Sequence, residues 1–174
     1  MRQTSAEILD GIESLGLDAG ITYLDNEPLG RVSQIPLYTE FYRFLCTNVS
    51  PLAQRKSVSW AEVAQEPLCL LTADMQNRRI VNQHLGEAGT RVNAMVESNS
   101  TIALISHVKS GTWSSVVPMK LAEMFVGQNL VAIPITDPEA EHLVGLITPR
   151  RDPQTPVLKA LIDEAVRLGL WRNR

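Results

Sequence analysis

The chain has 174 residues, of which 44% are hydrophobic and 20% are charged, and its formal net charge is −3. This composition is typical of a globular protein that can bury a core without disulfide or metal cross-links. No apolar run approaches the roughly 20 residues of a membrane span, and charges interrupt the segment 1–16 as they do not in a signal peptide. We therefore expect a cytoplasmic protein whose acidic surface does not itself hold DNA phosphates.

Helix-start signals mark the N-terminal third. Thr4 and Glu7 have the spacing of a capping box, which predicts a helix that runs to about Gly16. The segment 25–30 is a loop by composition. The expected strands around it are 17–24, 32–37 and 40–47.

Strands and helices alternate along the rest of the chain. Ser59 and Glu62 form a second capping box, while Asp74, Ser98 and Thr155 stand where each could cap the following helix. The expected helices are 59–66, 75–87, 99–110, 118–125 and 156–168. The expected strands are 68–71, 92–96, 116–117, 130–135 and 143–148.

This order predicts an α/β protein with two lobes. Regular strand–helix alternation favours parallel sheets covered by helices. The middle of the chain contains a complete β-α-β-α-β set, so the flanking segments have to pair with each other. We therefore expect lobe I to comprise residues 1–45 and 136–174 and lobe II residues 46–135, with the chain crossing twice between them.

Five segments, in order and at suitable spacing over nearly the whole chain, resemble the sensing domain of LysR-type transcription regulators. They are LDAGI at 17–21, SPLA at 50–53, WAEVAQEP at 60–67, GTWSSVVP at 111–118 and the C-terminal segment 149–165. Two positions depart from the family pattern, because Ser50 stands in place of a histidine and Trp113 in place of a glycine.

The resemblance implies a type 2 periplasmic-binding-protein fold that binds a small effector, expected to be anionic, between its lobes. It also implies that the family's DNA-binding domain, and the first strand, helix and second strand of lobe I, are absent, so that lobe I is incomplete. The strand at 17–24 then has an open edge, which favours association. We expect a homodimer or higher homo-oligomer joined by helices such as 6–15, with DNA contacted only through the missing domain.

The sharpest candidate site is the turn Ser98, Asn99, Ser100 and Thr101. Small polar residues that open a helix directly after a strand can cradle a carboxylate or phosphate with free backbone N–H groups. The alternative is a purely structural role, in which Ser98 only caps the helix. The family resemblance favours effector contact, most of all for Ser98 and Asn99.

Thr22 and Tyr23 are the candidate contacts from the other lobe. They end their predicted strand, and ligands of open α/β sheets bind beyond the carboxyl ends of strands. Packing of Tyr23 on a neighbouring loop is the alternative. A weaker candidate is the helix start 75–79, where Gln76 or Asn77 could reach an effector and an arginine could pair with an anion. Surface arginines more often pair with acidic residues or water.

We expect no metal, cofactor or catalytic set. The three histidines have no second ligand at helical spacing, the two cysteines, Cys46 and Cys69, lie in hydrophobic segments, and no nucleophile elbow or phosphate-binding loop occurs. A regulatory binding domain is therefore the favoured function. A stand-alone solute-binding protein and a small α/β enzyme with dispersed catalytic residues are the alternatives, and a turnover screen would favour the latter if it found activity.

Overall fold

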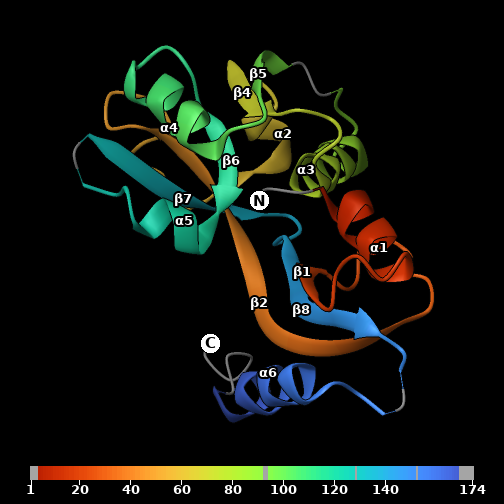
Figure 1. Ribbon diagram of the computed structural model, residues 1–174. Helices are drawn as coiled ribbons and strands as arrows, with labels where there is room; N and C mark the ends of the chain where they lie inside the picture. Colours follow the sequence, from red (N-terminus) through yellow and green to blue (C-terminus); the bar gives the residue numbers. More distant parts are fainter. Residues whose placement is uncertain (1–3, 92–93, 128, 152, 169–174) are drawn as a thin grey trace. The chain divides into compact units, whose positions relative to one another are not determined.

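The computed structural model describes residues 4–91, 94–127, 129–151 and 153–168 (Figure 1). The chain divides into two compact units. Unit 1 comprises Met1–Glu40 and His142–Arg174, and unit 2 comprises Phe41–Glu141. The chain thus passes into unit 2 after residue 40 and returns after residue 141, about five residues from each boundary expected from the sequence.

Unit 1 begins with a well-capped helix. Its elements are α1 (Ser5–Glu13), β1 (Gly20–Tyr23), the first part of β2 (Val32–Thr47), β8 (Glu141–Pro149) and α6 (Pro156–Leu168). The capping box at the start of α1 is confirmed, because the Thr4 hydroxyl accepts from the Glu7 amide at 3.3 Å and the Thr4 amide donates to the Glu7 carboxylate at 2.7 Å. Both bonds satisfy amides that a helix end leaves without partners.

In unit 1, β8 lies between β1 and β2. The β1–β8 pair is antiparallel, from Gly20 opposite Ile147 to Tyr23 opposite Val144. Among the described residues β8 is the only strand that pairs with β1, so the other edge of β1 is open. Gly20 also lets α1 approach β1, since a Cβ atom there would lie 2.2 Å from Cγ2 of Ile8.

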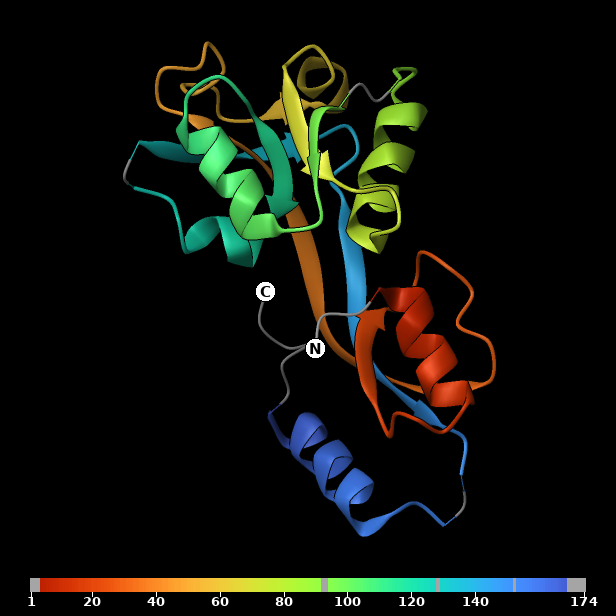
Figure 2. The same cartoon turned by 45° about the horizontal axis from the view of Figure 1, so that its top comes forward.

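Unit 2 holds the larger core. Its elements are the rest of β2, β3 (Val58–Ser59), α2 (Trp60–Val63), β4 (Leu68–Leu71), α3 (Gln76–Glu87), β5 (Ala94–Ser98), α4 (Thr101–Lys109), β6 (Ser115–Pro118), α5 (Met119–Glu123) and β7 (Leu130–Thr136). Helices α3 and α4 flank the β4–β5 pair (Figure 2). Leu104, Ile105 and Val108 of α4 pack with Cys69 and Leu71 of β4 in one buried cluster.

The sheets are mixed rather than parallel, which corrects the sequence expectation. β2 pairs antiparallel with both β6 and β7, whereas β4–β5 and β3–β7 are parallel. A helical crossover connects β4 to β5 and returns the chain in the same direction. β2 carries the chain into unit 2, and β7 lies beside it in the opposite direction. Strand–helix alternation does not report the direction of such a long-range pair.

Two predicted helix caps are wrong. The residue before α3 is Met75, which makes no side-chain cap, rather than Asp74. The residue that caps α4 is Ser100, whose hydroxyl accepts from the Ala103 amide at 3.4 Å, rather than Ser98. Ser98 instead ends β5, because pairing with Leu71 of β4 extends the strand two residues beyond the expected end. In the described part of the chain, no helix is long and apolar enough to cross a bilayer.

Candidate functional site

The carboxyl ends of β4 and β5 come together in unit 2. The strands run side by side to Leu71 and Ser98, and the Thr72 amide donates to the Ser98 carbonyl at 3.2 Å just beyond them. Helices α3 and α4 both begin within a few residues of this point. We call residues 72–76 and 98–101 the strand-end edge. Two helix N-termini and two strand ends meet there, which is where open α/β folds bind ligands.

The four predicted contacts of unit 2 all lie on the strand-end edge. The Ser98 hydroxyl accepts from the Ser100 amide at 3.1 Å, and the Ser100 hydroxyl caps α4. Each hydroxyl therefore serves as an acceptor and keeps its own proton as a donor. The Asn99 side chain is exposed and has no hydrogen-bond partner among the described residues, while Thr101 is half-buried. The edge thus offers donors that suit a carboxylate.

The helix start 75–79 was the weaker candidate for effector contact, and its two arginines bind to other parts of the protein. The Arg78 side chain is 7% exposed, and it donates to the Leu71 carbonyl, to the Glu97 carboxylate at 2.7 Å and to the Asn82 side chain at 2.7 Å. Arg78 therefore links the ends of β4 and β5. Arg79 donates to the Asp74 carbonyl at 2.7 Å. Both arginines hold the strand-end edge together.

Other polar residues of α3 also face protein partners. The side-chain amide of Asn77 donates to the Tyr42 hydroxyl at 3.1 Å. The Gln76 side chain is buried and also interacts with other residues of the protein. Asn77 thereby fixes the first turn of α3 to β2.

The two predicted contacts of unit 1 are part of a separate polar network. The Thr22 hydroxyl donates to the Ser5 hydroxyl at 3.1 Å, and the Tyr23 hydroxyl donates to the Glu40 carboxylate. The Tyr23 ring also meets the His142 ring edge-on, with centroids 6.1 Å apart. Thr22 is buried and Tyr23 half-buried. Sequence reasoning did not anticipate Glu40 as the partner of Tyr23.

Glu40 is the centre of this network, and it is only 9% exposed. Burial raises its pKa, while hydrogen bonds from Tyr23 and Tyr38 and the proximity of His142 oppose that rise. Burial, together with the Glu40 charge, raises the pKa of Tyr38 to about 12. His142 in turn lies 3.3 Å from an Asp25 oxygen. Glu40 and His142 are the two residues of unit 1 at which the chain leaves and re-enters it.

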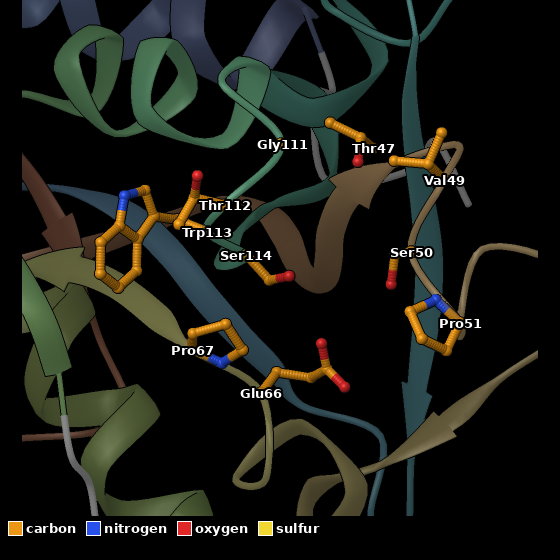
Figure 3. Close-up of a pocket in the computed structure, with 10 residues that line it drawn as sticks. All are labelled: Thr47, Val49, Ser50, Pro51, Glu66, Pro67, Gly111, Thr112, Trp113 and Ser114. Carbon is orange, nitrogen blue, oxygen red and sulfur yellow. The ribbon is translucent and has the colours of Figure 1, made fainter.

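Unit 2 also contains a polar pocket of about 210 Å³ that the sequence did not predict (Figure 3). It lies where β4 and β6 begin. The strand-end edge is at the other end of β4. Thr47, Val49, Ser50, Pro51, Glu66, Pro67, Gly111, Thr112, Trp113 and Ser114 line it. The pocket thus has one carboxylate and several hydroxyl groups.

An open, basic pocket of about 500 Å³ lies on unit 1. Arg31, Arg150 and Arg151 line it together with Glu13, over a floor that includes Ile12 and Val32. The Arg150 Nε donates to the Val32 carbonyl at 3.2 Å, which fixes this side chain against β2. The pocket thus combines the adjacent Arg150 and Arg151 with Arg31 from a distant segment of the chain.

Thiol and metal chemistry receive little support from the described residues. Cys46 and Cys69 are free and buried, and burial raises the pKa of both, that of Cys69 to about 11. A thiol is reactive as its thiolate, so these cysteines are poor nucleophiles near neutral pH. The described part of the chain contains no group of three or more His, Cys, Asp or Glu side chains that could hold a metal ion. His84 instead stacks on Trp60, with centroids 4.9 Å apart.

Comparison with known structures identifies the fold. The effector-binding domain of QuiR in complex with shikimate superposes with a TM-score of 0.80 at 19% identity, covering 96% of this chain and 78% of that one. The reduced OxyR regulatory domain from Pseudomonas aeruginosa superposes with a TM-score of 0.78 at 21% identity, covering 94% and 78%. This chain therefore has the fold that these two domains share, and the predicted α/β fold class is confirmed.

Comparison with sequences identifies the family. The profile of the LysR substrate binding domain matches residues 1–169, so the chain belongs to this family, as its motifs indicated. It is similar to a probable nitrogen assimilation transcriptional activator of Synechococcus elongatus, with 24% identity over 71% of this chain and 40% of that protein. An uncharacterized HTH-type transcriptional regulator of Escherichia coli, YbhD, is 21% identical over 90% of this chain and 48% of that protein. The chain thus spans less than half the length of these relatives.

Proposed function

We propose that this chain senses a small anionic metabolite and regulates transcription through a DNA-binding domain carried by a longer protein. The observation that carries the ligand part is the strand-end edge, where two helix N-termini and the donors of Ser98, Asn99 and Ser100 meet. The regulatory part rests on family membership and on the relatives, which are named as transcription regulators and are about twice as long. We propose no enzymatic activity.

The donor geometry favours an anion over a neutral ligand. A carboxylate accepts two or more hydrogen bonds, and the partial positive charge of a helix N-terminus adds to their strength. Because Arg78 is already paired with Glu97, we assign ligand contact to the turn 98–101 and a supporting role to Arg78. Thr22 and Tyr23 remain predicted ligand contacts on unit 1. Their hydroxyl groups donate hydrogen bonds to Ser5 and Glu40, respectively.

The ligand proposal is tested by calorimetric titration of the chain with a panel of small carboxylates. Shikimate is the first member, because the similar QuiR domain holds it. We expect one carboxylate to bind and Asn99→Ala to weaken it about tenfold, as loss of one hydrogen bond to a charged group implies. Asn48→Ala is the matched control, because Asn48 is also exposed in unit 2 but lies at the end of β2. Equal affinity in Asn99→Ala and Ser98→Ala chains would remove the turn from the site.

The regulatory proposal has a separate test. The reading frame of the parent gene is expected to encode a helix-turn-helix segment of about 60 residues in the same protein as this domain. We also propose that the domain forms a homodimer, with α1 among the contacting helices. Sedimentation of the chain as a monomer at micromolar concentration would contradict the dimer without affecting the ligand assignment.

A further inference from the structure

The polar pocket at the start of β4 and β6 has the chemistry of a cation site. The Thr47 and Ser114 side chains are only 7% and 4% exposed, yet neither hydroxyl has a hydrogen-bond partner among the described residues. Both hydroxyl oxygens are accessible from the pocket, so each can bond to a ligand there without breaking a bond within the chain. Figure 3 shows both hydroxyls pointing into the pocket.

Glu66 supplies the only charge of the lining. Its carboxylate points toward the Ser50 and Ser114 side chains, whereas the Trp113 ring is turned away (Figure 3). Glu66 forms no ion pair with any residue in the described ranges, and the nearby Arg55 is paired with Glu62 at 3.0 Å. The lining residues include no lysine, arginine or histidine. The pocket therefore presents oxygen acceptors and an unneutralised negative charge.

We propose that this pocket binds the ammonium group of a small primary amine. A primary ammonium group has three N–H donors, which match the Glu66 carboxylate and the hydroxyl oxygens around it. Val49, Pro51 and Pro67 provide apolar walls for the carbon atoms of the amine. A pocket of about 210 Å³ accommodates a molecule of only a few heavy atoms. This site is separate from the strand-end edge and independent of the proposed anionic effector.

The sequence contributes one further argument. Three of the segments that resemble the family pattern line the pocket, and the two departures from that pattern, Ser50 and Trp113, are both lining residues. Ser50 occupies a position where the pattern has a histidine. An imidazole there would fill space that the serine leaves open and would place a donor beside Glu66. Serine has a smaller side chain than histidine and carries no positive charge, so position 50 leaves room in the pocket and does not neutralise Glu66.

The test is a titration of the isotope-labelled chain with propylammonium chloride, followed by the backbone amide signals of Ser50 and Ser114. We expect saturating shifts with a dissociation constant on the order of millimolar, as suits a ligand of a few heavy atoms. Glu66→Gln and Ser50→His are each expected to abolish saturation. Glu62→Gln is the matched control, because Glu62 is a neighbouring acid outside the pocket and glutamine can retain its capping role.

Two other salts separate the alternatives. Tetramethylammonium chloride has the same charge but no N–H donors, and it is expected to produce no saturation. Potassium chloride tests for a metal-ion site built from the same oxygens. Saturation by potassium at similar concentration, an unchanged response in Glu66→Gln, or no saturation by propylammonium would each overturn the assignment. Unchanged thermal unfolding of Glu66→Gln would show that its effect is local.

Discussion

The hydrogen bond between Tyr23 and Glu40 provides a quantitative test of the unit 1 network. The change Tyr23→Phe removes one phenol donor from a carboxylate that is 9% exposed, and leaves the longer bond from Tyr38 at 3.4 Å. A hydrogen bond to a charged group contributes about 1.5–3 kcal/mol, and one between neutral groups about 0.5–1.5 kcal/mol. We therefore expect the variant to lose about 2 kcal/mol of unfolding free energy when Glu40 is ionised.

The loss is expected to depend on pH in a definite direction. Burial raises the pKa of Glu40 above its ordinary value of 4.5, so the folded chain binds the proton more tightly than the unfolded chain. The contribution of this group to stability is then complete below pH 4.5 and declines as the pH rises through the raised pKa. Tyr23→Phe makes that decline larger, because one donor fewer stabilises the carboxylate and the pKa of Glu40 rises further. The difference between the two chains grows from about 1 kcal/mol while Glu40 is protonated to about 2 kcal/mol once it is ionised.

The measurement is urea unfolding at several pH values, combined with hydrogen exchange of the β1 amides that pair with β8. Tyr38→Phe is the matched control, and its longer bond predicts a smaller loss. Glu40→Gln should flatten the pH dependence in both backgrounds, since the amide does not ionise. A Tyr23→Phe effect that is equal below pH 4.5 and above the raised pKa of Glu40, or that persists unchanged in the Glu40→Gln background, would refute the assigned bond.

Three further outcomes follow from contacts of unit 2. Ser100→Ala is expected to destabilise the chain by about 1 kcal/mol through loss of the α4 cap, as measured by thermal unfolding, whereas equal stability would show that the cap is dispensable. Trp60→Phe removes the 3.0 Å bond from the indole to the Pro138 carbonyl and should cost about 1–3 kcal/mol in urea unfolding, an effect below 0.5 kcal/mol being the contrary result. Cys46 and Cys69 should resist a thiol reagent near neutral pH until the chain unfolds, and rapid labelling of the native chain would show that they are accessible.

Features set by neighbouring residues could be predicted from the sequence. The capping boxes at Thr4 and Ser59 were placed correctly because both partners lie three residues apart. The cap of α4 was misplaced because Ser98 and Ser100 have the same hydroxyl chemistry. The choice between them depends on how far β5 continues along β4, which is a long-range pairing.

The candidate sites likewise divide into those built from neighbouring residues and those built from residues far apart in the sequence. The turn 98–101 could be proposed from sequence because a strand end and a helix start adjoin there. The Tyr23–Glu40 bond could not, since it joins residues 17 positions apart, and His142 reaches the network from more than 100 residues away. The amine pocket carried only an indirect signal, the two departures at Ser50 and Trp113. Hydroxyls that line a pocket and hydroxyls that face solvent look alike in a sequence.

The continuous strand β2 restricts how the length of this chain can vary. Its 16 residues serve unit 1 at one end and pair with β6 and β7 in unit 2 at the other. Successive strand residues face opposite sides, and Phe44, Leu45 and Cys46 are all fully buried, so a one-residue insertion that slipped the unit 2 register would exchange the side chains on both packed faces. A bulge can take up one extra residue without slipping the rest of the register. Natural length variants of this domain are therefore expected in the exposed segment 48–57 and not in β2.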